Sequence, residues 1–308
     1  MKRETPTCIV IVGPTAVGKT PLSLEVASHF ETEIISADSR QCYVELNIGV
    51  AKPSYQQLKQ VKHYFISSHS IHQEVNAKVF EAYALRSIQE IFASNAMAVM
   101  SGGTGLYVKA FCEGLDEIPE VNSDIRKNII SSYSTNGISW LQNEIQQQDP
   151  QFYETGEIQN PQRMMRALEV KLSTGKSVLD FHSRIKRQRN FSIIKVGLFL
   201  PKQELYSHIN ARVDQMMNEG LLEEARQLYP FKNVNALQTV GYKELFDHFD
   251  GKISLDDAVE QIKTNTRHFA KRQMTWFRRD KEILWLENNK SFNWKTRLLP
   301  MLSTSPAQ

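Results

Sequence analysis

The stretch CIVIVGPTAVGKT, residues 8–20, joins a short apolar segment to a glycine-rich loop. Residues 8–12 are apolar and mostly β-branched, and Gly13 follows them, a pattern typical of a short buried strand. Residues 13–20 match the phosphate-loop pattern G-x-x-x-x-G-K-[ST]. The two glycines let successive backbone N–H groups point into one concavity, and the helix expected next directs its positive end there. The stretch therefore predicts a site for a molecule that carries a diphosphate or a triphosphate.

Each part of this phosphate loop has a role in the prediction. Lys19 supplies a mobile cation for phosphate oxygens, and the hydroxyl of Thr20 is placed to hold a Mg²⁺ ion. The alternative is a chance match in a surface loop; the strand pattern before the loop and the amphipathic pattern of residues 22–30 after it disfavour that alternative. The residues expected to bind the phosphates are Gly13, Pro14, Thr15, Ala16, Val17, Gly18, Lys19 and Thr20.

The composition limits what kind of protein this is. The net charge of +3 means that any nucleic-acid binding must come from a local basic patch, because the overall charge is nearly balanced. The three cysteines, Cys8, Cys42 and Cys112, are widely spaced, which argues against a zinc site or a disulfide framework and predicts a reducing, cytoplasmic location. No segment approaches the roughly 18 apolar residues of a membrane span. We expect no zinc and no membrane association.

The order of the remaining patterns predicts an α/β fold, a P-loop NTPase-like parallel sheet flanked by helices. Further strands are expected at residues 33–37, 63–66, 96–100, 193–200 and 283–286. Residues 117–190 differ, because they show little strand pattern and several helical segments rich in Gln, Asn and charge. We therefore expect a catalytic core of residues 1–116 and 191–308, with a helical insertion domain of residues 117–190.

Two segments follow strands that are expected to end at the ligand-binding edge of the sheet. Asp38 comes directly after the strand at residues 33–37, where open α/β sheets place their ligands. It could serve as a Mg²⁺ ligand, a general base or a helix N-cap. The sequence GGTG, residues 102–105, follows the strand at residues 96–100, and its glycines let the backbone approach a ligand closely.

Two basic segments lie in the second half of the chain. Residues 184–189 carry four positive charges in six positions, which suits either a solvated loop or an arm that contacts phosphates. A long helix is expected from Ser254 to about Arg279, and Arg267, Lys271 and Arg278 fall on one stripe of it. This stripe either holds RNA or merely solvates the helix face opposite Phe269, Trp276 and Phe277, which would then pack against the sheet.

Taken together, these motifs resemble the tRNA dimethylallyltransferase (isopentenyl-diphosphate:tRNA isopentenyltransferase) family. The matching stretches follow the family's order over nearly the whole chain. They are GPTAVGKT at 13–20, ADSRQCY at 37–43, NIGVAKP at 47–53, GGTGLYVKA at 102–110, QRMMRALEV at 162–170, TGKS at 174–177, ARVDQMM at 211–217, VGYKE at 240–244 and TRHFAKRQMTWFRR at 266–279. Val17, Asn47 and Val50 depart from the usual residues. Three scattered cysteines cannot form the zinc finger of eukaryotic members, so the chain resembles a bacterial-type member.

The resemblance implies transfer of a dimethylallyl group from dimethylallyl diphosphate to N6 of adenosine 37, just 3′ of the anticodon. Asp38 would act as the base, Thr104 would sit where the two substrates meet, and Arg212 would help neutralise the diphosphate, with Mg²⁺ as cofactor. The implied partners are the tRNA anticodon stem-loop and dimethylallyl diphosphate, bound by a monomer. The residues expected to contact tRNA are Asp38, Ser39, Arg40, Gln41, Thr104, Arg126, Gln162, Arg163, Met164, Met165, Arg166, Arg267, Lys271 and Arg278.

Three other functions are compatible with a phosphate loop in a parallel sheet. A nucleotide kinase would share the sheet and a helical insertion. A prenyltransferase acting on free adenylate would share the diphosphate chemistry, and an NTP-gated RNA-binding switch would share the loop and the basic patch. The basic and aromatic residues at 263–281 argue against the kinase and the free-nucleotide enzyme, because a small acceptor does not need them.

Overall fold

The computed structural model describes residues 5–183, 185–289 and 292–303. The chain divides into two compact units, a core unit of Met1–Glu113 with Gln188–Gln308 and an insertion unit of Gly114–Arg187. The sequence placed these boundaries three residues further along the chain, after residues 116 and 190. Each unit has its own hydrophobic core.

The core unit is built on a six-stranded sheet in the order β3-β2-β4-β1-β5-β6, and every neighbouring pair is parallel. The strands are β1 (Thr7–Val12), β2 (Ile34–Ser36), β3 (His63–Tyr64), β4 (Met97–Gly102), β5 (Ser192–Phe199) and β6 (Leu284–Glu287). The apolar run that precedes the phosphate loop is thus a central strand, paired with β4 on one side and β5 on the other. This confirms the predicted α/β fold with a parallel sheet.

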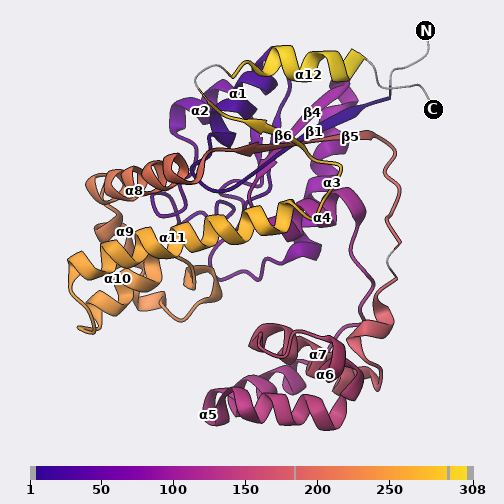
Figure 1. The fold of residues 1–308 in the computed structure, drawn as a ribbon, viewed down its shortest axis with the longest axis vertical. Helices are drawn as coiled ribbons and strands as arrows, with labels where there is room; N and C mark the ends of the chain where they lie inside the picture. Colours follow the sequence, from indigo (N-terminus) through magenta and orange to yellow (C-terminus); the bar gives the residue numbers. More distant parts are fainter. Residues whose placement is uncertain (1–4, 184, 290–291, 304–308) are drawn as a thin grey trace. The chain divides into compact units, whose positions relative to one another are not determined.

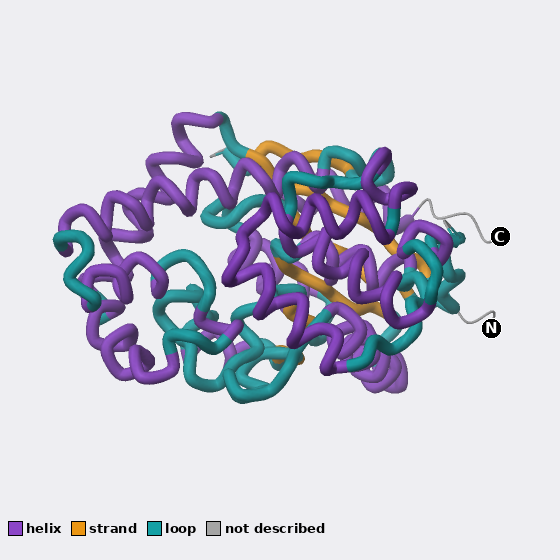
Figure 2. Tube along the Cα trace, turned by 90° about the horizontal axis from the view of Figure 1, so that it is seen from below, coloured by secondary structure: helices purple, strands orange, loops and turns teal. Residues whose placement is uncertain are grey.

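Alternation along β1 explains why helices cover both faces of the sheet. Cys8, Val10 and Val12 belong to one core cluster, while Ile9 and Ile11 belong to the other. Figure 1 shows the helices arranged around the strands, and Figure 2 shows the strands, in orange, with helices on both sides. The helices of the core unit are α1 (Lys19–His29), α2 (Tyr55–Gln60), α3 (Ala77–Ser94), α4 (Gly105–Glu113), α8 (Lys202–Asn218), α9 (Leu221–Leu228), α10 (Tyr242–Phe249), α11 (Leu255–Phe277) and α12 (Trp294–Ser303).

Side-chain caps mark the starts of several helices. The Asn76 side chain accepts hydrogen bonds from the N–H groups of Lys78 and Val79 at the start of α3, and Ser254 accepts one from Asp257 at the start of α11. By contrast, α12 lies in a segment where the sequence carries no clear helix signal. Tertiary packing accounts for this helix, since the Trp294 side chain is buried against the core and packs edge-on against His29 of α1.

The insertion unit is helical, with α5 (Ser123–Gln148), α6 (Pro150–Thr155) and α7 (Pro161–Thr174). Helix α5 consists of two helical segments separated at Gly137, where φ is +74°. The hydrophobic core of the insertion unit includes Leu141 and Ile145 of α5 and Met164 and Leu168 of α7, all of them buried.

Candidate active site

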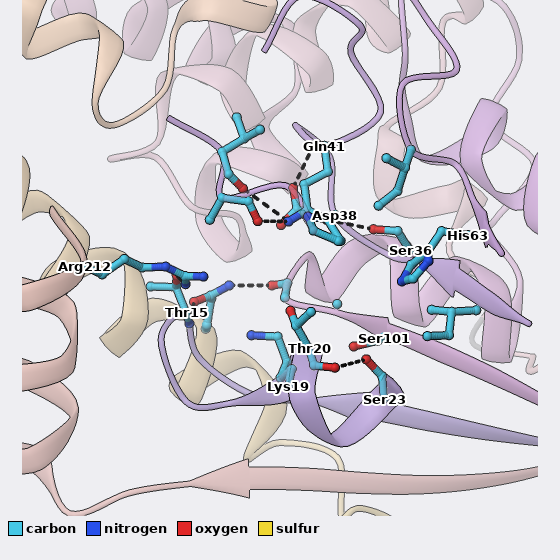
Figure 3. A pocket seen from close by; sticks show the side chains of 18 of the residues that line it. Thr15, Lys19, Thr20, Ser23, Ser36, Asp38, Gln41, His63, Ser101 and Arg212 are labelled. Atoms are coloured by element: carbon cyan, nitrogen blue, oxygen red, sulfur yellow. Dashed lines mark hydrogen bonds between the residues drawn. The ribbon is translucent and has the colours of Figure 1, made fainter. Parts of the chain in front are cut away.

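A polar pocket lies where the central strands of the sheet end (Figure 3). The phosphate loop follows β1, Asp38 follows β2 and the GGTG loop follows β4, so parallel pairing brings three distant segments to one edge. The pocket is lined by Thr15, Lys19, Thr20, Ser23, Ile34, Ser36, Asp38, Gln41, Val50, Ala51, Pro53, His63, Ile66, Ser101, Gly102, Gly103, Arg212, Phe269 and Gln273.

The phosphate loop has the backbone geometry that its glycines permit. Gly13 has a φ of +145°, and a Cβ there would lie 2.6 Å from the carbonyl oxygen of Leu198 on β5. Gly18 has a φ of +93° and immediately precedes α1, whose first N–H groups lack intrahelical partners. Asn288 holds the loop from the other end of the chain by donating a hydrogen bond of 2.8 Å to the Val17 carbonyl. The loop is therefore a preformed cradle for an anion at a helix N-terminus.

Two cations face this cradle from different helices. Lys19 of α1 donates to the Pro14 carbonyl at 2.7 Å, and Arg212 of α8 reaches the Thr15 hydroxyl at 3.4 Å. Loss of hydration and then the charge of Arg212 lower the pKa of Lys19 to about 7, while Asp38 opposes the shift. Loss of hydration also lowers the pKa of Arg212. Because the positive charge of Arg212 disfavours the charged form of Lys19, the two side chains together form a site that favours an anion.

Asp38 has one occupied and one available carboxylate oxygen. Its Oδ1 accepts hydrogen bonds from the backbone N–H groups of Arg40 and Gln41 at 2.8 and 3.2 Å, which caps the turn that follows. Among the described residues, no donor bonds its Oδ2. Asp38 therefore caps a turn, in place of the helix that the sequence allowed, and keeps an oxygen for a second role in the pocket.

Thr104 links the GGTG loop to the turn that carries Asp38. Its hydroxyl oxygen accepts the N–H of Ser39 at 3.0 Å, and its backbone N–H donates to the Ala37 carbonyl at 3.1 Å. Close packing explains the glycines before it, because a Cβ on Gly102 would lie 2.2 Å from the Ala37 carbonyl oxygen. The structure thus brings the predicted Asp38 and Thr104 together beside the phosphate loop.

Gln41, predicted to contact tRNA, lines the pocket and supports its wall. Its amide donates hydrogen bonds to the carbonyls of Val50 and Ala51, so the side chain holds the loop of residues 47–53. Glu224 of α9 anchors the same loop, since its carboxylate accepts the N–H groups of Asn47, Ile48 and Gly49. Val50, Ala51 and Pro53 of the NIGVAKP stretch thus line the pocket with apolar side chains, a role that the sequence did not reveal.

Helix α11 contributes two pocket residues that the sequence pattern missed, Phe269 and Gln273. Phe277 is buried as expected, but Phe269 is 40% exposed at the pocket instead of packing against the sheet. Gln273 is buried. Both residues lie in the family motif at residues 266–279, so the sequence contained a signal for them. The function of this stretch was interpreted from its basic residues.

Of the three basic residues in the stripe on α11, Arg267 is bonded to neighbouring side chains. Arg267 donates to Asn210 on α8 at 2.7 Å and to Thr264 at 2.9 Å, and its guanidinium lies 5.8 Å from the Tyr206 ring centroid. The structure therefore assigns much of its bonding capacity to holding α8 and α11 together. Lys271 and Arg278 are exposed. These two cations remain candidates for contact with RNA phosphates.

In the insertion unit, the predicted tRNA contacts separate into exposed cations and buried methionines. Met164 is 0% and Met165 6% exposed, which corrects their prediction as RNA contacts: both side chains serve packing. Arg126 and Arg166 converge on the buried carboxylate of Glu169, at 3.8 and 3.4 Å, and keep more than a third of their side-chain surface exposed. Arg163 pairs with Glu157, and Gln162 is exposed.

In the basic run of residues 184–189, Arg187 and Arg189 are bonded to other parts of the chain. Arg184 lies outside the described residues. Arg189 is almost buried and bonds Glu81 at 2.8 Å and the carbonyls of Ala110 and Phe111. Arg187 pairs with Glu117 at 2.8 Å. Arg189 thus fixes the chain where it re-enters the core unit, which excludes it as a phosphate contact.

Within residues 5–183, 185–289 and 292–303, neither the cysteines nor a cluster of metal-binding side chains indicates a further site. All three cysteines are free and buried, and burial raises the pKa of the Cys42 thiol to about 12. No group of three or more His, Cys, Asp or Glu side chains in these ranges could hold a metal ion. None of the helices described there is long and apolar enough to cross a membrane.

Comparison with known proteins gives consistent matches. Residues 41–280 match the family described as IPP transferase. The chain is 50% identical over 279 residues to a tRNA dimethylallyltransferase of Christiangramia forsetii, covering 91% of this chain and 92% of that protein. It is 47% identical to the tRNA dimethylallyltransferase of Flavobacterium johnsoniae, covering 91% and 92%.

Solved structures agree with these relatives. The full-length tRNA isopentenylpyrophosphate transferase of Bacillus halodurans superposes with a TM-score of 0.69 at 32% identity, covering 97% of this chain and 95% of that one. A eukaryotic dimethylallyltransferase acting on tRNA gives a TM-score of 0.77 at 25% identity, covering 97% and 78%. Sequence and fold thus point to one family over nearly the whole chain.

Proposed function

The chain belongs to the tRNA dimethylallyltransferase family, and we propose that it transfers a dimethylallyl group from dimethylallyl diphosphate to N6 of adenosine 37, next to the anticodon of tRNA. The observation that carries this proposal is the pocket, which joins a phosphate loop and two cations to a carboxylate with one available oxygen. The apolar wall formed by Val50, Ala51 and Pro53 suits the hydrocarbon chain.

The first chemical task is to stabilise the departing diphosphate. As the bond between the allylic carbon and the phosphate oxygen breaks, negative charge accumulates on that oxygen. The N–H groups of the phosphate loop, Lys19 and Arg212 face the site where this charge develops. Because these groups are already in place, they stabilise the transition state without reorganising.

The second task is to activate the adenine amine, a poor nucleophile because its lone pair is delocalised into the ring. As the N6–carbon bond forms, the nitrogen must lose a proton, and the available oxygen of Asp38 would accept it. Thr104 would position the base at this point, since its hydroxyl joins the GGTG loop to the Asp38 turn. The base must leave its stack to reach the pocket, which is easier in a loop than in a duplex.

Phe269 offers the extruded base a surface. Its exposed ring lines the pocket at the same edge as Asp38 and Arg212. Aromatic side chains stack on unpaired bases in single-stranded RNA. We therefore add Phe269 to the residues that would contact the target adenosine.

A Mg²⁺ ion fits the phosphate end of the pocket. The Thr20 hydroxyl lines the pocket and makes no hydrogen bond among the described residues, so it is available as an oxygen ligand. Mg²⁺ is usually bound by few protein groups together with water and substrate phosphates. Thr20 would hold the ion, and the bound ion would offset the negative charge of the diphosphate.

We also propose a division of labour between the units and a cellular setting. The core unit would carry the chemistry, and the insertion unit would hold tRNA through Arg126, Gln162, Arg163 and Arg166, whose side chains reach solvent. Three free, buried thiols suit a cytoplasmic enzyme. We propose that it acts as a monomer.

Radiolabelled dimethylallyl diphosphate, offered with unmodified tRNA or with AMP, tests the proposed function. We expect label to enter tRNA with release of diphosphate, no label in AMP and no requirement for ATP. Label in AMP would favour a free-adenylate prenyltransferase, whereas phosphate transfer from ATP would favour a kinase. RNA binding that depends on a nucleoside triphosphate, without any transfer, would favour a binding switch.

Salt dependence tests the RNA surface on α11. Replacing both Lys271 and Arg278 by glutamine is expected to weaken tRNA binding and flatten the slope of log affinity against log salt by about 1.5, because each phosphate contact contributes roughly −0.7 to −0.9. Arg267→Gln is the matched comparison, and we expect its slope to stay at the wild-type value because Asn210 and Thr264 occupy the guanidinium. A wild-type slope in the double variant would move the RNA contacts elsewhere.

A further inference from the structure

Gln273 is a buried polar side chain that the mechanism above does not use. It lies on α11, is 7% exposed, and extends from the helix face on which Ala270 and Phe277 are also buried. That face packs directly against the GGTG loop. A Cβ on Gly103 would lie 2.2 Å from the Gln273 amide nitrogen, and one on Gly105 would lie 2.2 Å from the Trp276 ring.

The Gln273 amide joins two loops that are far apart in sequence. Its Oε1 accepts the backbone N–H of Thr15 in the phosphate loop at 2.8 Å, and its Nε2 donates to the Gly103 carbonyl at 2.9 Å. An amide suits this position because it offers an acceptor and a donor on one planar group. The reverse amide orientation would place a donor against the Thr15 N–H and an acceptor against the Gly103 carbonyl, so only one orientation fits.

Each loop carries one half of the chemistry. Thr15 lies in the loop that cradles diphosphate, and Arg212 contacts the Thr15 hydroxyl. Gly103 precedes Thr104, whose hydroxyl holds the turn that carries Asp38. The distance between the leaving group and the base therefore depends on how these two loops are held together, and misplacement of about 1 Å can cost 10²-fold in rate.

We propose that Gln273 is a positioning residue that sets the spacing between the diphosphate cradle and the loop that presents Thr104 and Asp38. This inference rests on the proposed function. The opposite face of the same helix carries the exposed Lys271 and Arg278. RNA bound there would thus contact the helix that also orders the reacting loops.

The Gln273→Glu variant tests the donor role of this side chain separately from its acceptor role, because pH determines whether the carboxyl group carries a donor. A carboxylate accepts the Thr15 N–H but opposes the Gly103 carbonyl, whereas a protonated carboxyl satisfies both. Burial favours the neutral acid. We expect the single-turnover rate of Gln273→Glu, divided by the wild-type rate at the same pH, to be about 0.1 or less at high pH, since an unpaired buried polar group costs about tenfold or more. The ratio should rise as pH falls, because the acid regains its donor.

Two variants accompany this measurement. Gln273→Met, similar in length but with neither group, should be slow at every pH. Gln261→Glu, which places the same charge on the exposed side of α11, should give a flat ratio near one. Dissociation constants for tRNA and for dimethylallyl diphosphate should change less than the rate.

The outcomes distinguish the two proposals. A pH-independent ratio for Gln273→Glu, or a wild-type rate in Gln273→Met, would overturn the positioning role while wild type remains active. If Gln273→Met fails to fold, the pH profile of Gln273→Glu still decides. Absence of transfer by the wild-type protein would overturn the proposed function and this inference with it.

Discussion

Replacing Asp38 by asparagine is expected to lower the single-turnover rate of prenyl transfer by about 10²-fold or more, the usual effect of removing a positioned base. Asparagine retains an Oδ1 for the N–H groups of Arg40 and Gln41, so the turn should survive. Its amide cannot accept the proton of the adenine amine. The measurement is rapid-quench transfer with enzyme in excess over tRNA, together with the thermal midpoint and the dissociation constant for tRNA.

Comparison with Asp38→Ala separates the two roles of this side chain. Alanine removes the turn cap as well as the base, so it should lower both the rate and the thermal midpoint. Asparagine should lower the rate alone. If Asp38→Asn reacts at nearly the wild-type rate while Asp38→Ala is slow and unstable, Asp38 has a structural role and the base must be sought elsewhere.

Replacing Arg212 by glutamine is expected to lower kcat by about 10² to 10³-fold, the scale observed when one donor to developing negative charge is removed. Arg212 lies on α8 and reaches Thr15 of the phosphate loop across the pocket. Its cation also contributes to the lowered pKa of Lys19, so the pKa of Lys19 should rise in the variant. Affinity for inorganic diphosphate, measured by calorimetry, should fall with kcat.

Two variants control this experiment. Arg212→Lys keeps the charge but loses the forked guanidinium, and should recover part of the rate. Arg226→Gln removes a cation on α9 that is exposed and paired with Glu223, and it should leave kcat unchanged. A wild-type kcat in Arg212→Gln would show that the phosphate loop and Lys19 suffice to stabilise the leaving group.

Both predictions depend on a pocket that α8 and α11 complete from the second half of the chain. Lys19, Thr20, Asp38 and the GGTG loop come from its first third. Arg212 and Gln273 then reach the phosphate loop from helices that follow the insertion unit. The second half of the chain therefore supplies part of the pocket besides any surface for RNA.

The sequence by itself determined the features that depend on neighbouring residues. The apolar run before Gly13 forms β1, the phosphate loop leads into α1, and Ser254 caps the long helix expected after it. These signals are local, because a strand, a cap or a glycine turn is encoded within a few positions. The family motifs extended this local information to the reaction and to Asp38, Thr104 and Arg212 as its candidate residues.

Only the tertiary structure decided which side chains remain free to act. Met164 lies in a helix predicted to contact RNA, but it is buried. Arg189 forms an ion pair with Glu81, and Arg267 donates a hydrogen bond to Asn210. The bond between Thr15 and Gln273 joins residues 258 positions apart. No periodicity or spacing encodes such a partner, because a charged or amide group looks the same in a sequence whether it meets solvent, substrate or another side chain, and long-range packing makes that choice.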